Sequence, residues 1–214
     1  MALEGIDGSG TTTHARLLVE GLRRTGLRVV LVEEPSRGPI GQLIRRFMRG
    51  EEVFDQKVLA LLFAADRLLL HRGVPVADVV VGDRSWVSSL VYQSLDLFPD
   101  AAPLDWVYTV NRYAPRPDLL VFLDVDPVVA YKRLLARRGR EVPETKLSYL
   151  RGLARRYREV VEALEDVLTV FRVPVAEPEP PVEAVAKSIL AAVLAVVAYK
   201  RGRSGLVAEG ASSS

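Results

Sequence analysis

The chain has 214 residues, 49% of them hydrophobic, which is enough for one substantial core and excludes a mostly disordered protein. Without cysteine it can form no disulfide, thiolate metal site or cysteine nucleophile, and two histidines are too few for a histidine-rich metal site. The net charge is +2, and 24 of the 29 basic residues are arginine, which suits phosphate binding. The base composition of a genome would explain that total equally well.

Strand and helix patterns alternate along the chain. Residues 29–32 form a continuous apolar run, which is typical of a strand buried on both faces. Ile40, Leu43, Ile44 and Phe47 recur at helical spacing. By such patterns we predict strands over residues 1–4, 29–32, 79–81, 119–123 and 168–171. We predict helices over residues 12–24, 39–49, 55–72, 87–95, 127–138, 143–166 and 181–199.

Alternation of this kind predicts an α/β fold in three layers, with about five parallel strands and helices on both faces. We expect a single domain over residues 1–198 and a flexible tail over 199–214. The longest apolar run, residues 189–198, is too short to cross a bilayer, and the first residues do not resemble a signal peptide. We therefore expect a cytoplasmic protein with neither membrane nor nucleic acid as a partner.

Glycine, carboxylate or arginine follows each of the first four strands. The four segments are Gly5–Gly10, Glu33–Gly38, Asp83–Ser85 and Asp124–Asp126. Because ligands of parallel sheets bind beyond the carboxyl ends of the strands, one edge should combine phosphate-binding and metal-binding groups.

The segment from Gly5 to Thr12 fits the phosphate-loop pattern GxxxxGK[ST] except that Thr11 replaces the lysine. Such glycines let backbone amides turn onto a phosphate, and the following helix N-terminus adds partial positive charge. Thr12 would supply the hydroxyl for Mg²⁺. The missing lysine implies that another cation replaces it or that phosphoryl transfer is impaired.

A basic cluster offers a replacement. It consists of Lys132, Arg133, Arg137, Arg138 and Arg140. Arg137, Arg138 and Arg140 lie around Gly139, where a helix ends before Pro143, so we predict a lid over about residues 137–146 that carries arginine to the phosphate. A solvated helix face is the alternative reading.

Several segments together resemble the thymidylate kinases of the P-loop nucleoside monophosphate kinase group. The segment EGIDGSGTTTHA resembles EGxDGSGKTT, LLFAADR resembles LLFxAxR, and DRSWVSSLVYQ resembles DRYxxSxxAYQ. The segments EEPSRGPIGQLIR, FLDVDPVVAYKRL and PETKLSYLRGLARRYREV follow the family in the same order. The resemblance covers roughly residues 2–195. It implies transfer of the ATP γ-phosphoryl group to dTMP with Mg²⁺, and a homodimer that binds small nucleotides.

The resemblance also implies site residues. ATP would be bound by Gly5, Ile6, Asp7, Gly8, Ser9, Gly10, Thr11 and Thr12. dTMP would be bound by Asp7, Arg37, Phe63, Arg67, Arg84, Ser88, Ser89, Tyr92 and Gln93. Thr12 and Asp83 would hold the metal, and the catalytic set would be Asp83, Arg84, Arg137, Arg138 and Arg140.

Within those sets the resemblance implies distinct tasks. Arg37 and Arg84 would grip the acceptor phosphate. Phe63 would stack on thymine, Arg67 would bond the base edge, and Tyr92 would lie under the deoxyribose. Phe63 and Arg67, at i and i+4, share a helix face, although spacing alone would also allow Phe63 to be core.

Two other functions remain open. A deoxynucleoside kinase would share the Asp83-Arg84-Ser85 pattern, but it would have no acceptor phosphate for Arg37. A nucleotide-binding protein that lost transfer together with the lysine is the non-enzymatic alternative.

Overall fold

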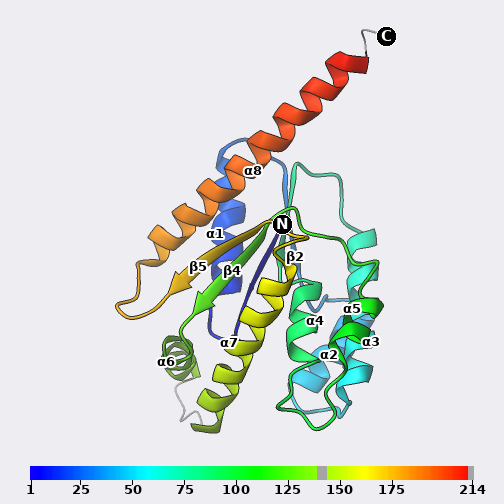
Figure 1. Cartoon of the computed structure of the whole chain (residues 1–214), viewed down its shortest axis with the longest axis vertical. Coiled ribbons are helices and arrows are strands. Elements are labelled where there is room, and N and C mark those ends of the chain that lie inside the picture. The colour runs from blue at the N-terminus through cyan, green and yellow to red at the C-terminus, as the bar shows by residue number, and fades with distance from the viewer. Residues whose placement is uncertain (139–143, 212–214) are drawn as a thin grey trace.

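The structure is a computed structural model that describes residues 1–138 and 144–211. Its centre is a five-stranded parallel sheet in the order β2-β3-β1-β4-β5 (Figure 1). The strands are β1 (Ala2–Gly5), β2 (Val29–Glu33), β3 (Val79–Asp83), β4 (Leu120–Val125) and β5 (Val170–Val175). This confirms the predicted α/β class and strand number.

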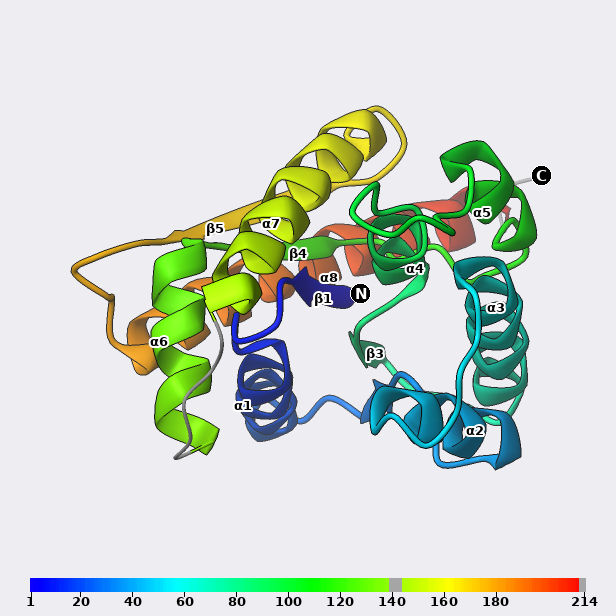
Figure 2. The same cartoon turned by 90° about the horizontal axis from the view of Figure 1, so that it is seen from below.

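Helices cover both faces of the sheet. They are α1 (Thr11–Arg24), α2 (Pro39–Met48), α3 (Gln56–Arg72), α4 (Trp86–Tyr92), α5 (Leu104–Val110), α6 (Pro127–Arg138), α7 (Glu144–Leu164) and α8 (Val182–Ala211). α1 and α8 pack together on one face, and α4 and α7 cover the other (Figures 1 and 2). α2, α3 and α5 form a group beside α4.

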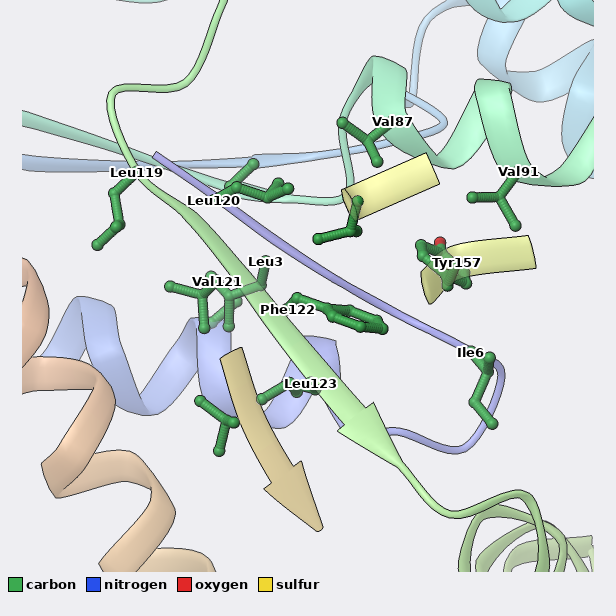
Figure 3. Packing of buried hydrophobic residues seen from close by; sticks show 14 of the residues in the cluster. Leu3, Ile6, Val87, Val91, Leu119, Leu120, Val121, Phe122, Leu123 and Tyr157 are labelled. Carbon is green, nitrogen blue, oxygen red and sulfur yellow. The ribbon is translucent and has the colours of Figure 1, made fainter. Parts of the chain in front are cut away.

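The main core lies between β1, β4 and the helices on either side. Leu3, Phe122 and Tyr157 are almost fully buried, and the Phe122 and Tyr157 rings stack with centroids 5.7 Å apart (Figure 3). β1 has only four residues, yet all four are buried because β3 and β4 flank it on both sides. A short strand is stable here because both of its neighbours complete its hydrogen bonding.

Most predicted boundaries differ from the structure by one to three residues, and larger differences concern β5, α5 and α8. The predicted strand 168–171 begins two residues later and runs to Val175, and it accommodates Pro174 because β5 is an edge strand. The seven-residue α5 was not predicted, since one buried residue, Val107, gives too little periodicity. α8 extends to Ala211 although we predicted its end near Tyr199.

The expectation that no segment could cross a membrane needs correction for α8. An 18-residue stretch within Val182–Gly202 has a mean hydropathy of 1.9, so this segment is long and apolar enough to span a bilayer by length and composition. A criterion of uninterrupted apolar residues misses this helix, because Lys187 breaks the run. Val185, Ile189 and Val193 are nevertheless buried, on a helix that packs against α1.

The connectivity reverses around β1. From β1 the chain passes β3 to form β2, returns to β3, and then crosses to β4 on the other side. Such a switch point leaves a crevice at the carboxyl ends of the central strands. The loops after β1 and β3 therefore define the candidate site.

Candidate functional site

The loop after β1 has the backbone of a phosphate-binding turn. Gly8 and Gly10 adopt φ values of 82° and 91°, which favour glycine. A Cβ on Gly5 would lie 2.7 Å from Ser9 Oγ and 2.8 Å from the Leu123 carbonyl. The first hydrogen bond into α1 runs from His14 N to Gly10 O, so the preceding amides have no partner within the helix. They are available to an anion, as the sequence predicts.

Thr11, at the position of the usual lysine, is buried at the start of α1. Ile6 is also buried within the core, so it can meet a ligand only through its backbone.

Thr12 and Asp83 meet at the base of the loop. Thr12 Oγ1 donates a 2.6 Å hydrogen bond to Asp83 Oδ2, although the residues are 71 positions apart. Asp83 Oδ1 is buried and has no hydrogen-bond partner among the described residues. A hydroxyl beside an unsatisfied buried carboxylate oxygen fits a hydrated Mg²⁺, which favours oxygen ligands and retains waters.

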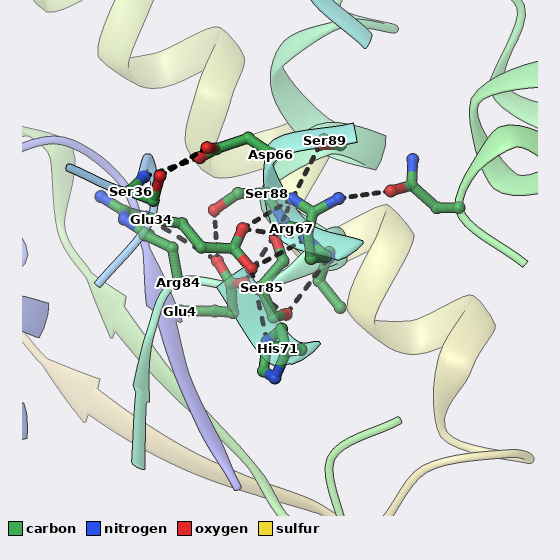
Figure 4. Close-up of polar contacts among 12 residues, drawn as sticks. Glu4, Glu34, Ser36, Asp66, Arg67, His71, Arg84, Ser85, Ser88 and Ser89 are labelled. Carbon is green, nitrogen blue, oxygen red and sulfur yellow. Dashed lines mark hydrogen bonds and ion pairs between the residues drawn. The ribbon is translucent and has the colours of Figure 1, made fainter. Parts of the chain in front are cut away.

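A buried carboxylate, Glu4, organises the start of α4 (Figure 4). Ser85 Oγ and Ser88 Oγ donate to it at 2.8 Å and 2.6 Å, and Tyr157 Oη donates at 3.0 Å. Burial raises the pKa of Glu4, against the opposing effects of Arg84 and these hydrogen bonds.

Arg84 extends from the end of β3 into the same network. Its Nη1 lies 3.8 Å from Glu4 Oε2, and it donates to the Gly5 carbonyl and, at 2.9 Å, to Tyr157 Oη. Arg84 has φ 78°, a left-handed conformation that costs a non-glycine residue about 1 kcal/mol or more. The contacts of its guanidinium therefore hold an unfavourable backbone in place.

Asp7 links the loop to α4 and α7. Tyr92 Oη donates to Asp7 Oδ1 at 2.7 Å, and Lys146 Nζ donates to Asp7 Oδ2 at 2.9 Å. Burial acts to raise the pKa of Asp7, but Lys146, Arg84 and the Tyr92 hydrogen bond together outweigh it, and the net shift of the pKa is downward. Asp7 is therefore a carboxylate at neutral pH.

Arg67 is largely occupied by protein groups. It is 1% exposed and bonds Glu34 through Nε and Nη2, Asn111 Oδ1 through Nη1, and Ser89 Oγ at 3.2 Å (Figure 4). Asp66, its neighbour on α3, accepts from Ser36 N and Oγ at 2.6 Å and 2.5 Å. These contacts tie α3 to the loop after β2, and a hydrogen bond to a base edge would compete with them.

The other residues predicted to bind dTMP lie in different surroundings. Phe63 is half-buried and is not part of the main core cluster, which leaves its ring available to a ligand. Gln93 is buried, and its Oε1 has no partner in the described part of the chain. Ser88 and Ser89 are engaged with Glu4 and Arg67. Arg37 is 91% exposed and lies 3.9 Å from Glu33.

The predicted lid falls partly outside the described residues, including Arg140 and the segment 139–143. Arg137 is exposed near the end of α6, and the side chain of Arg138 is also outside the description. From the same basic cluster, Arg133 Nη1 donates to the carbonyls of Gly8 and Ser9 at 3.3 Å and 3.1 Å. Glu179 holds the other side of this guanidinium at 2.7 Å.

Sequence reasoning assigned no role to several members of these networks, among them Glu4, Glu34, Lys146 and Tyr157. The sequence did contain an indication for Glu4, because it is a charged residue inside a strand whose other residues are buried and uncharged. Lys146 lies within the predicted lid, but nothing in the sequence indicated its pairing with Asp7, which is 139 positions away.

Comparison with known proteins gives the family of the chain. A sequence model described as thymidylate kinase matches residues 3–189. A putative thymidylate kinase of Aeropyrum pernix is 46% identical over 151 residues, which cover 68% of this chain and 70% of that protein. A probable thymidylate kinase of Methanothermobacter thermautotrophicus is 45% identical over 139 residues, 62% of this chain and 68% of that protein.

A solved structure shows the same fold. The crystal structure of thymidylate kinase from Ehrlichia chaffeensis aligns with a TM-score of 0.66 at 19% identity, covering 90% of this chain and 96% of that one. The family match spans the phosphate loop, the Asp83-Arg84 strand end and α7. The chain therefore belongs to the thymidylate kinase family.

Proposed function

We propose that this protein transfers the γ-phosphoryl group of ATP to dTMP in a Mg²⁺-dependent reaction. The observation that carries the proposal is the contact between Arg84 and the Gly5 carbonyl. It places a guanidinium suited to an acceptor phosphate directly against the loop suited to the donor phosphates.

In the reaction, an oxygen of the dTMP 5′-phosphate attacks the γ-phosphorus of ATP. The bond from that phosphorus to the β–γ bridging oxygen breaks, its electron pair stays on that oxygen, and dTDP and ADP are the products. The attacking phosphate is already a nucleophile, so no general base is needed. Catalysis consists of positioning and charge neutralisation.

Mg²⁺ would be held through the Thr12 hydroxyl and, by way of water, through Asp83. When bound it neutralises charge on the phosphate oxygens. The loop amides then orient the donor, and Arg84, fixed by Glu4 and Tyr157, orients the acceptor.

We assign the nucleoside end of dTMP to the region between α3 and α4. Phe63 would offer its half-buried ring to the base, and Tyr92, whose Oη donates to Asp7, would lie under the deoxyribose. Arg37 would swing from its exposed position onto the acceptor phosphate, and Gln93 would contribute its unpaired oxygen. Arg67 would position Glu34 and Ser89 through its hydrogen bonds to them, and it would also bond the edge of the base.

We propose in addition that residues 137–146 form a lid over the donor phosphates. Arg137, Arg138 and Arg140 would close over the donor phosphates, and closure would exclude water and suppress ATP hydrolysis. We further propose one domain over residues 1–198, a tail over 199–214, and a cytoplasmic location.

We also propose a homodimer through α3. Leu61, Leu68 and Leu69 are exposed on this helix at spacings that place them on one face. Exposed apolar side chains gathered on one face are typical of a protein interface. Leu68→Glu with Leu69→Glu should convert a dimer into a monomer in light scattering, whereas a monomeric native protein would refute the interface.

The decisive test is an assay of purified protein with ATP, Mg²⁺ and each deoxynucleoside monophosphate, scored for the diphosphate product. We expect dTDP as the main product. Phosphorylation of thymidine in place of dTMP would support the deoxynucleoside kinase alternative. Calorimetric binding of dTMP and ATP without any product would support the inactive binder.

A further inference from the structure

The phosphate loop lacks its lysine, yet basic side chains from elsewhere reach it. Among the described residues, three of them hydrogen-bond to the loop: Arg84, Arg133 and Lys146. They differ in what else holds them, and this difference decides which one can replace the ammonium group missing at Thr11.

Arg84 and Arg133 are committed to other contacts. Arg84 is largely buried against Glu4 and Tyr157 below the loop. Arg133 bonds two loop carbonyls and, through Nε and Nη2, Glu179. Nε, Nη1 and Nη2 of Arg133 therefore all donate to protein acceptors, which leaves this guanidinium little capacity to bond a phosphate.

Lys146 differs from the two arginines because its ammonium group keeps donors that could bond a phosphate. It is on the first turn of α7, its Nζ is 2.9 Å from Asp7 Oδ2, and its side chain is 30% exposed. An ammonium group has three donors, and Asp7 takes one of them. The Nζ also lies 4.2 Å from the centroid of the Tyr149 ring, a cation–π contact that further fixes its position.

The position of the Lys146 ammonium beside Asp7 would place a positive charge between the two substrates. Asp7 belongs to the loop that would hold ATP, and its other oxygen accepts from Tyr92, on the helix assigned to dTMP. An ammonium on Asp7 therefore lies at the junction of the donor and acceptor regions. That is where negative charge accumulates when the γ-phosphoryl group moves.

We propose that Lys146 supplies, from α7, the ammonium group that the phosphate loop lacks at Thr11, and that it acts on the phosphates of ATP during transfer. This inference rests on the proposed kinase function. Lys146 forms no bond to phosphorus and moves no proton. It neutralises charge on the donor phosphates as the bond to the bridging oxygen breaks.

The test compares Lys146→Met, Thr11→Lys and the double variant with the native protein. We expect Lys146→Met to lower kcat about 100-fold while the KM for dTMP changes less than threefold, since one preorganised donor contributes about 10²–10³ in rate. Thr11→Lys in the Lys146→Met background should restore kcat at least about tenfold by returning the charge to the loop.

The matched control is Lys200→Met. Lys200 also pairs with an aspartate, Asp118, but Lys200 lies on α8 rather than at the phosphate loop. We expect kcat of this variant to stay within about twofold of the native value, as for a surface ion pair.

Three results would overturn the proposal. They are a kcat for Lys146→Met within threefold of native, a loss confined to the KM for dTMP, and a double variant no faster than Lys146→Met. If the loss appears instead in Arg137→Ala with Arg138→Ala while Lys146→Met is normal, the two lid arginines supply the charge.

A binding measurement separates this proposal from the proposed function. Calorimetry with a non-hydrolysable ATP analogue needs no turnover, and Lys146→Met should weaken that binding at least about tenfold, as loss of a charged hydrogen bond does. If the native protein makes no dTDP but this loss is observed, the kinase function fails and the phosphate contact stands. Unchanged analogue binding together with unchanged kcat would remove Lys146 from the site.

Discussion

The two arginines predicted to grip one phosphate lie in opposite surroundings. Arg84, at the end of β3, contacts Glu4, Gly5 and Tyr157 and has a side chain that is 19% exposed. Arg37, beyond the end of β2, is 91% exposed, and among the described residues its side chain pairs with Glu33, at 3.9 Å. The first is preorganised before any ligand arrives, whereas the second would have to be ordered by it.

The difference follows from where the strands lie. β3 is flanked by β2 and β1, and Arg84, just beyond its end, contacts Gly5 and Tyr157 of α7, whereas β2 is an edge strand. A side chain fixed in advance costs little conformational entropy on binding, while an exposed arginine loses up to about 2 kcal/mol of rotamer freedom. The same residue type should therefore contribute mainly to rate at Arg84 and mainly to substrate affinity at Arg37.

Arg84→Met should have the largest effect. It would leave Glu4 as an uncompensated buried charge, which costs about 3 kcal/mol in the free energy of unfolding, and would lower kcat/KM about 1000-fold. Urea unfolding and steady-state kinetics measure the two effects. Adding Glu4→Gln should recover much of the stability but none of the rate, and recovery of both would contradict the assigned role.

Arg37→Ala should have a smaller and purely functional effect. Its ion pair with Glu33 is exposed, so the free energy of unfolding should change by less than about 0.5 kcal/mol. The KM for dTMP should rise roughly tenfold, the loss of one charge-assisted hydrogen bond of about 1.5 kcal/mol. A loss of kcat as large as that of Arg84→Met would contradict the assignment of Arg37 mainly to substrate affinity.

The smallest expected effect is the contribution of buried Glu4 to the pH dependence of the free energy of unfolding. Burial raises the pKa of Glu4 in the folded protein above its unfolded value, so the folded state binds the proton more tightly. Its contribution to stability is therefore present at low pH and is lost as pH rises through the folded pKa. Glu4→Gln should flatten the fall in unfolding free energy with rising pH, measured by urea titration at several pH values, and a slope parallel to the native one would contradict this.

Local patterns sufficed for much of the fold. The short β1, the loop and α1 follow from an apolar run, two glycines at fixed spacing and a helical repeat, all within the first 24 residues. The contact of Thr12 with Asp83 was also predictable, because parallel strands end at the same edge of the sheet. α5 escaped prediction because seven residues with one buried side chain carry almost no periodicity.

The sequence by itself determined the fold class, the phosphate loop and the absence of its lysine, because these depend on neighbouring residues and fixed spacing. Only the tertiary structure decided that Lys146 meets Asp7, that Glu4 anchors Arg84, and that Arg67 is held by Glu34. Those pairs are separated by 139, 80 and 33 positions, and they meet because β1, β3, α3 and α7 converge at one edge of the sheet. Charge partners at such separations are set by packing, which no local pattern of residues encodes.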